Sequence, residues 1–300
     1  MIYGALEAGG TKMVLAVADD DLRILDRISI PTGRPEDTVP LIADYFRQQR
    51  IDALGVGSFG PLDLNPQSPT YGYITKTPKA GWRDYPLLPT LLNALRVPGM
   101  LDTDVNAAAL WEAERGAARG ARNCVYVTVG TGIGAGVYCE GNLVHGLMHP
   151  EWGHMLAVPH PDDPMPRGVC PYHDGCLEGL ASGPSMEKRW GRPAWDLPAE
   201  HPAWQIEAYY LAQLCVTALM TVSPEKIMLG GGVMHQAQLF PLIRKETVRL
   251  LNGYLPCVTD GEDLIRPPAG WPDSGLMGSL LLAQRAWKKA EGTDNCRARI

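Results

Sequence analysis

The chain has 300 residues, a formal net charge of −6 and 45% hydrophobic residues, enough to bury one large core or the cores of two ordinary lobes. Its acidic balance, without a run of lysine or arginine, argues against a nucleic-acid or anionic membrane surface, so we expect small-molecule partners. No apolar stretch reaches the ~18 residues that a bilayer span needs, and no basic-then-apolar signal segment opens the chain. With seven cysteines, an odd number that suits reduced thiols, these features indicate a cytoplasmic protein.

The first part of the chain has the alternation of strands and helices of an α/β lobe. Its apolar runs predict strands at 1–7, 12–18 and 23–29, a helix at 37–49, and strands at 53–57 and 98–101. The loop at 59–85, rich in proline, glycine and threonine, is longer than idle connections usually are, so we expect it to line a binding cleft. Trp82 in this loop could stack on a ligand ring or exclude water. Thr103 or Asp104 then caps a helix that runs to about residue 116.

The second part of the chain predicts a similar α/β lobe. Its elements, in order, are a strand pair at 124–129 and 133–138, a helix at 204–222, a strand at 226–229, and helices at 240–251 and 274–286.

Two glycine-rich turns each join a pair of strands, one at residues 7–12 (EAGGTK) and one at 130–136 (GTGIGAG). Glycine lets the backbone approach an anion closely, threonine hydroxyls add donors, and Lys12 adds positive charge, so both turns could hold phosphate. Neither has the spacing of a Walker loop or the G-x-G-x-x-G that opens a helix in dinucleotide-binding folds. An ordinary hairpin would explain one such turn, but two copies ~120 residues apart indicate a duplicated unit that clamps a nucleotide between two lobes.

Four side chains between residues 154 and 176 have the spacing of a zinc site: His154, Cys170, His173 and Cys176. Zinc takes thiolate and imidazole ligands in fours, and four protein ligands leave no position for a catalytic water, so the metal would be structural. The alternative is a set of unrelated buried thiols. Glu151 and Glu178 flank the quartet, which suggests that the metal orders a polar binding site.

The ordered motifs of the chain resemble those of the ROK family of sugar kinases. They are LEAGGTK at 6–12, GSFGPLD at 57–63, DVNAA at 104–108, GTGIG at 130–134, EWGH at 151–154, CLEGLASG at 176–183 and GGGV at 230–233. Within that family, TYG at 70–72 and TPKAGW at 77–82 resemble the bacterial fructokinase branch.

The resemblance implies an α/β, two-lobed, actin-like ATPase fold of the duplicated ribonuclease H-like type, with a cleft between the lobes. We expect an N-terminal lobe at 1–117, joined by a C-terminal helix at about 286–300, and a C-terminal lobe at 118–285 that carries the zinc loop. The last predicted helix, at 274–286, should also return to pack on the N-terminal lobe. ATP, Mg²⁺ and a structural Zn²⁺ are the implied cofactors, and a homodimer is the implied assembly.

The implied activity is that of an ATP:hexose 6-phosphotransferase that converts D-fructose to fructose 6-phosphate. A mannokinase or glucokinase of the same family, or a non-catalytic sugar-sensing protein, are the alternatives. Sugar-responsive ROK repressors carry a helix-turn-helix domain before the first phosphate loop; here that loop begins at residue 6, so we expect no such domain and no nucleic-acid partner.

Asp104 is the expected general base, although from the residues alone it could equally be a helix cap. The resemblance assigns substrate binding to Gly60, Pro61, Thr103, Asn106, Glu151, His154 and Glu178. It assigns nucleotide binding to Glu7, Gly9, Gly10, Thr11, Lys12, Thr131, Gly132, Gly134, Gly230, Gly231 and Gly232, the last three of which a packing turn explains nearly as well. His154 could bind zinc with one ring nitrogen and a sugar hydroxyl with the other.

Three residues depart from the commoner family pattern. Glu7 replaces aspartate, Thr103 replaces asparagine, which bears on sugar preference, and His173 replaces a cysteine, which leaves a Cys₂His₂ set that should still bind zinc. The other histidines follow no ligand pattern and receive no role: His145, His149, His160, His201 and His235. Of these, His149 and His160 are interpreted as loop residues near the zinc.

Overall fold

The computed structural model describes residues 1–292, which form two compact units. Unit 1 comprises Met1–Trp111, His145–His149 and the described chain from Asp273 onward; unit 2 comprises Glu112–Val144 and Pro150–Pro272. The first boundary lies at Trp111 rather than at the expected 117, and the last lies at Pro272 rather than at 285, because the whole of helix α8 (Ser274–Ala290) belongs to unit 1. Residues 293–300 of the expected return helix lie outside the described residues.

Unit 1 is built on a five-stranded sheet of order β3-β2-β1-β4-β5. The strands are β1 (Tyr3–Ala8), β2 (Lys12–Ala18), β3 (Ile24–Pro31), β4 (Ala53–Ser58) and β5 (Gly99–Thr103). Strand β1 pairs antiparallel with β2 and parallel with β4. The helices are α1 (Pro35–Gln49), α2 (Leu87–Leu95), α8, and α3 (Asp104–Glu114), which runs from unit 1 into unit 2.

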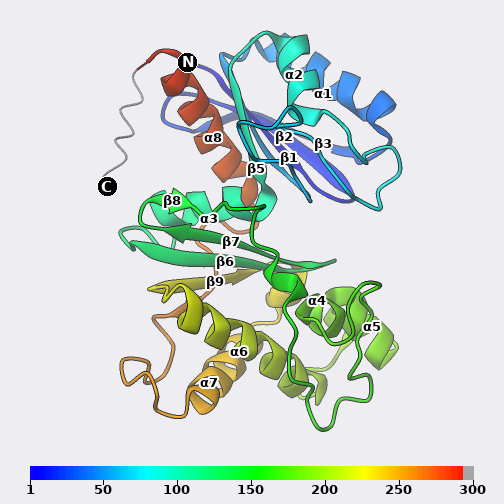
Figure 1. Ribbon diagram of the computed structural model, residues 1–300, viewed down its shortest axis with the longest axis vertical. Helices are drawn as coiled ribbons and strands as arrows, with labels where there is room; N and C mark the ends of the chain where they lie inside the picture. Colours follow the sequence, from blue (N-terminus) through cyan, green and yellow to red (C-terminus); the bar gives the residue numbers. More distant parts are fainter. Residues whose placement is uncertain (293–300) are drawn as a thin grey trace. The chain divides into compact units, whose positions relative to one another are not determined.

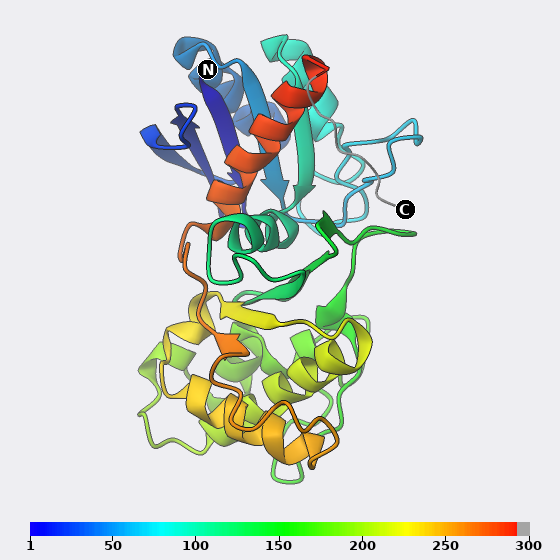
Figure 2. The ribbon, with the colours of Figure 1, turned by 90° about the vertical axis from the view of Figure 1, so that its left-hand side faces the viewer.

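Two glycines show how helices cover both faces of this sheet. A Cβ at Gly4 would lie 2.6 Å from the Ile51 side chain just after α1, whereas a Cβ at Gly55 would overlap the Ser279 carbonyl oxygen of α8. Ala5 is the β1 partner of Gly55, and successive side chains of a strand point to opposite faces. Helices α1 and α8 therefore pack on opposite faces of the sheet; Figure 2 shows α8, in red, crossing one of them.

Unit 2 repeats this organisation in a sheet of order β10-β9-β6-β7-β8. Its strands are β6 (Asn123–Val129), β7 (Ile133–Cys139), β8 (Asn142–Leu143), β9 (Lys226–Gly230) and β10 (Ile265–Arg266). Strand β6 pairs antiparallel with β7 and parallel with β9, as β1 does with β2 and β4. The expected duplication of a hairpin unit is therefore confirmed, and each unit can be followed in Figure 1.

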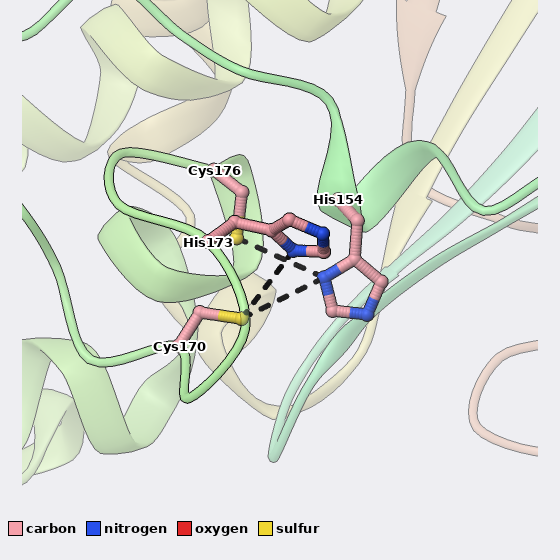
Figure 3. A group of neighbouring side chains, drawn as sticks. All are labelled: His154, Cys170, His173 and Cys176. Atoms are coloured by element: carbon pink, nitrogen blue, oxygen red, sulfur yellow. Dashed lines mark hydrogen bonds between the residues drawn. The ribbon is translucent and has the colours of Figure 1, made fainter. Parts of the chain in front are cut away.

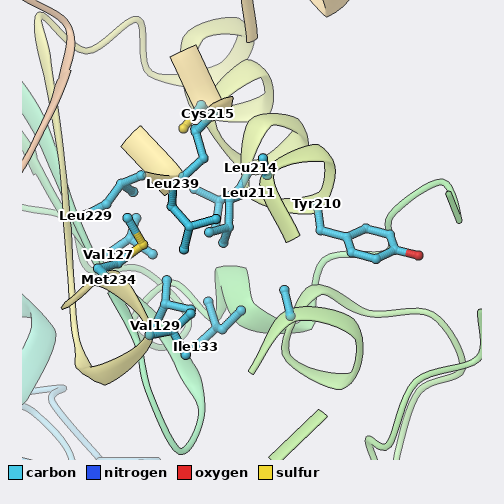
Figure 4. Close-up of a cluster of buried hydrophobic side chains, with 14 of the residues drawn as sticks. Val127, Val129, Ile133, Tyr210, Leu211, Leu214, Cys215, Leu229, Met234 and Leu239 are labelled. Atoms are coloured by element: carbon cyan, nitrogen blue, oxygen red, sulfur yellow. The ribbon is translucent and has the colours of Figure 1, made fainter. Parts of the chain in front are cut away.

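Helices and short turns complete unit 2. They are η1 (Trp152–His154), α4 (Leu177–Ala181), α5 (Gly183–Trp190), η2 (Ala194–Asp196), α6 (Ala203–Thr221), η3 (Gly232–His235) and α7 (Leu239–Leu251). Figure 4 shows the core, where Leu211 and Leu214 of α6 meet Val127 and Leu229 of the sheet. All four side chains are completely buried, so hydrophobic burial fixes the helix against the sheet. Among the described residues, no helix combines the length and apolarity that crossing a membrane requires.

Candidate active site

Asp104 lies where strand β5 ends and helix α3 begins. The Thr103 hydroxyl accepts a hydrogen bond from the backbone N–H of Asn106 (3.1 Å), so Thr103 is the residue that caps the helix. The Asp104 carboxylate accepts from the N–H of its neighbour Val105 (2.9 Å). Burial raises the pKa of Asp104 to about 6, against the opposing effect of its backbone hydrogen bonds. At neutral pH the group is ionised yet basic enough to accept a proton, as a general base requires.

Glu7, at the end of β1, is a second perturbed carboxyl group in unit 1. Its pKa is raised to about 7, mainly by burial and to a smaller extent by repulsion from Asp104 and Asp273. The positive charges of Lys12 and Arg27 act in the opposite direction. Both carboxyl groups are therefore weaker acids than usual, and Glu7 is shifted further than Asp104. Two acids whose pKa values are pushed apart can take different roles, and Asp104 is the one suited to accept a proton.

The raised pKa of Asp104 predicts a pH profile for the reaction proposed below. Since the base must be ionised in free enzyme, kcat/KM should fall about tenfold per pH unit below about 6 and level off above it. Initial rates between pH 5 and 8 would test this, with the thermal unfolding midpoint measured at each pH to exclude loss of folded protein. A profile that stays flat down to pH 5 would contradict the assignment.

The first glycine turn joins β1 to β2 and leaves its tip accessible. The N–H of Gly9 donates to the Lys12 carbonyl (3.1 Å), which closes the hairpin, and Gly10, Thr11 and Lys12 are exposed. The Lys79 ammonium group donates to the Gly10 carbonyl (2.8 Å), and its burial lowers its pKa. Sequence reasoning did not identify this second cation, although it lies inside the TPKAGW motif.

Residues 59–85 form an ordered part of unit 1. The Gly60–Pro61 peptide is cis, and the Pro61 carbonyl accepts from the N–H (2.8 Å) and hydroxyl (3.0 Å) of Thr75. The stacking predicted for Trp82 is wrong: its side chain is 1% exposed and its Nε1–H donates to the Gly33 carbonyl, so the ring is held in the core.

His149 lies in a loop, as expected. Its Nε2 accepts from the backbone N–H of Leu62 (3.1 Å), and the residue belongs to unit 1. The hydrogen bond from Leu62, which is remote in sequence, fixes the position of His149. The spacing of candidate metal ligands in the sequence could not predict this contact.

A hydrogen-bonded network next to Asp104 in sequence contains two residues that the sequence did not single out, the buried Asp102 and the exposed His145. Asp102 Oδ1 accepts from the N–H of Thr103 (2.8 Å) and from Nδ2 of Asn106 (2.7 Å), and its Oδ2 lies 2.9 Å from Nε2 of His145. The hydrogen bond to Asp102 is the main reason that the pKa of His145 is raised. Asn106, an expected sugar contact, is itself completely buried.

The second glycine turn, in unit 2, is held by Glu178. One Glu178 carboxylate oxygen accepts from the N–H of Ile133 (3.0 Å), and a Cβ at Gly132 would come within 2.5 Å of it. The N–H of Gly183 donates to the Gly130 carbonyl (2.8 Å), so the start of α5 supports the same turn. Glu178 therefore holds the turn directly. The sequence predicted Glu178 only as a sugar ligand, so this contact is an additional role.

The glycines after β9 differ in what they require. Gly231 has φ of +91°, and a Cβ there would lie 2.5 Å from the Val129 carbonyl oxygen, so both conformation and packing demand glycine. A Cβ at Gly230 would lie 2.8 Å from the Tyr126 hydroxyl, whereas nothing lies within 4 Å of one at Gly232. Packing thus explains Gly230 and Gly231. At Gly232 the space beside the backbone is open.

The four expected zinc ligands come together in unit 2 (Figure 3). Nδ1 of His154 lies 3.9 Å from Sγ of Cys170 and 3.8 Å from Sγ of Cys176, and Nδ1 of His173 lies 3.7 Å from Cys170. Tetrahedral zinc with ordinary bond lengths holds sulfur and nitrogen ligands about 3.6 Å apart, close to these three distances, and all four ligand atoms lie within 4.8 Å of one another. Nδ1 of His154 faces the thiols, which leaves Nε2 for another partner.

The expected site residues are divided between the two units. Unit 1 contains Glu7, Gly9, Gly10, Thr11, Lys12, Gly60, Pro61, Thr103, Asp104 and Asn106. Unit 2 contains Thr131, Gly132, Gly134, Glu151, His154, Cys170, His173, Cys176, Glu178, Gly230, Gly231 and Gly232.

The duplicated sheets with glycine hairpins define an actin-like ATPase fold. The chain belongs to the ROK family, whose family model matches residues 3–286. It is 47% identical to a fructokinase of Pediococcus pentosaceus over 97% of this chain and 100% of the relative. It is 44% identical to a fructokinase of Zymomonas mobilis subsp. mobilis over 96% and 98% of the two chains. The crystal structure of a ROK hexokinase from Thermus thermophilus superposes with a TM-score of 0.79 and 28% identity, over 96% of this chain and 100% of that one.

Proposed function

We propose that this chain is an ATP-dependent fructokinase that transfers the γ-phosphoryl group of ATP to the 6-hydroxyl of D-fructose. The similarity to fructokinases over the full length of both chains carries the proposal, since 47% identity exceeds the 28–29% found for a glucokinase and for N-acetylmannosamine kinases. The chemistry of Asp104 supports it independently. A carboxylate with a pKa of about 6 can accept the hydroxyl proton as the oxygen attacks phosphorus.

In this reaction the sugar O6–H bond breaks, an O6–P bond forms, the bond from phosphorus to the β,γ-bridging oxygen breaks, and ADP leaves. Asp104 takes the proton, and Lys12 with the backbone N–H groups of the glycine turns would balance charge on the phosphates. Magnesium bound with ATP would neutralise further phosphate charge, and Glu7 is the carboxylate we propose for its water shell. Zinc at the Cys₂His₂ quartet would supply a structural cross-link, with the free Nε2 of His154 available to a sugar hydroxyl.

A coupled assay of ADP release tests the proposed substrate. Fructose, mannose, glucose and N-acetylmannosamine would be compared at saturating Mg-ATP, and we expect the highest kcat/KM for fructose. Higher kcat/KM for mannose or glucose would preserve the phosphotransferase but overturn the fructose assignment. No turnover of any sugar, with measurable sugar binding, would favour a non-catalytic sensor. A cytoplasmic homodimer that engages neither nucleic acid nor membrane remains part of the proposal.

A further inference from the structure

A short segment of the chain, His145–His149, belongs to unit 1 although the residues on both sides of it belong to unit 2. Its two terminal histidines attach it: His149 accepts from the Leu62 backbone, and His145 bonds to the Asp102 carboxylate. The proposed mechanism uses neither imidazole. His145 is therefore brought by the fold to the strand end that also carries the proposed base, two residues beyond Asp102.

The proton positions on the His145 ring follow from its partners. The Asp102 carboxylate is 5% exposed and receives backbone and amide N–H donors on Oδ1, so Oδ2 is the acceptor for the imidazole. Nε2 of His145, 2.9 Å away, must then carry a hydrogen. The 3.4 Å approach of Asn106 Nδ2 to the same ring nitrogen joins two donors and is not a hydrogen bond. Nδ1 is left for a ligand.

Two observations indicate that a polar ligand belongs here. First, a cavity of about 480 Å³ is lined by His145 together with Leu62, Asp63, Thr75 and Met148, among others. Of its two titratable lining residues, Asp63 is engaged by the hydroxyls of Ser68 and Thr70. His145 is thus the ionisable group that this cavity can offer.

Second, Asn106 has a buried side-chain oxygen without a hydrogen-bond partner among the described residues. Its amide nitrogen is already committed to Asp102. An unsatisfied buried acceptor costs about 1–3 kcal/mol, so such atoms usually indicate a missing water or ligand hydroxyl. Both observations concern the same hydrogen-bonded group of side chains, and a ligand that carries hydroxyl groups would satisfy both.

We propose that His145 is a sugar-binding residue of the kinase, with Nδ1 contacting a hexose hydroxyl that does not react and Asp102 orienting the ring. The proposal rests on the proposed function for the identity of the sugar. A cavity of this volume exceeds what one hexose occupies, and pockets of roughly 300–1,000 Å³ are usual for small ligands. His145 would then contribute to sugar affinity, while Asp104 determines the rate of transfer.

Two substitutions separate the ligand role of His145 from its structural bond. In His145→Gln the amide nitrogen can replace Nε2 and keep the bond to Asp102, but nothing replaces Nδ1. In His145→Asn the amide occupies the place of Nδ1, and the bond to Asp102 is lost. We expect His145→Gln to raise the KM for fructose about tenfold or more, with kcat and the KM for ATP changed by less than threefold.

His145→Asn should instead retain fructose affinity better than His145→Gln and unfold at lower temperature. His201→Gln is the matched control, since the His201 ring accepts from the nearby N–H of Ala203 and contacts Trp190, and this substitution should leave all parameters unchanged. An unchanged KM for fructose in His145→Gln would overturn the proposal.

Calorimetric titration of each variant with fructose in the absence of ATP keeps this test separate from the proposed kinase activity. Wild-type protein that binds fructose but forms no ADP would contradict the kinase and leave the His145 comparison intact. Wild-type protein that binds none of the hexoses in the panel would overturn the sugar site at His145.

Discussion

Replacing Asp104 by asparagine is expected to lower kcat for fructose about 10²–10⁴-fold, the usual contribution of a positioned general base. Asparagine keeps the shape of the side chain and an oxygen for the Val105 N–H, but its amide cannot accept the hydroxyl proton. The KM values for fructose and ATP should change little, because the substitution affects the transition state more than ground-state binding. Steady-state kinetics with Mg-ATP and fructose would measure both effects.

The folded protein should tolerate this change. The folded-state pKa of Asp104 is raised above its unfolded value, so ionisation in the native state destabilises the fold as pH rises through that range. At pH 7 the neutral amide should therefore leave the unfolding midpoint equal or higher. Asp37→Asn is the control, an exposed carboxylate in the first turn of α1, and should keep full activity. A loss below tenfold in Asp104→Asn would leave Asp104 no more than a structural role.

The second large effect is expected from Cys176→Ser, which removes one thiolate of the zinc quartet. Cys176 is fully buried, and its sulfur also accepts from the N–H of Gly179 (3.4 Å) at the start of α4. Serine can still cap the helix, so the substitution isolates metal binding. Zinc per chain should fall from about one to near zero in emission spectrometry.

Unfolding measurements give the energetic consequence of zinc loss. Zinc at 1,000 times its Kd would stabilise the folded state by about 4 kcal/mol. Its loss should therefore lower the unfolding midpoint of Cys176→Ser by roughly 8–16 °C, the shift expected for a domain of 150–250 residues. Helix α4 carries Glu178, which holds the second glycine turn, so the KM for ATP should rise as well. Cys257→Ser, which changes an exposed free thiol, is the control. Cys176→Ser protein that lacks zinc yet unfolds at the same temperature as this control would show that the metal is not structural.

Local patterns carried most of what the sequence predicted correctly. The hairpins β1–β2 and β6–β7 follow from alternating apolar residues on both sides of glycine turns, and the duplication follows from their recurrence. The clustering of the Cys/His quartet also followed from spacing, since Cys170, His173 and Cys176 lie within one short loop. Short-range geometry suffices in both cases.

Features set by distant parts of the chain could not be predicted in this way. The role of His145 depends on Asp102, 43 positions away, and the burial of Trp82 depends on the Gly33 carbonyl. Neither pairing leaves a periodic or spacing signal. Lys79 was missed for the same reason, because its contact with Gly10 crosses 69 positions.

The packing of α8 against β4 has a consequence for how the chain is made. One face of the unit 1 sheet is covered by α8, which begins at Ser274, about 170 residues after β5 ends at Thr103. At ~5–20 residues per second, a ribosome needs about 10–30 s to synthesise that interval. During this time the nascent sheet exposes the surface around Gly55 that α8 will cover, a site for chaperones or for aggregation. Unit 1 therefore completes its fold only after α8 has been synthesised.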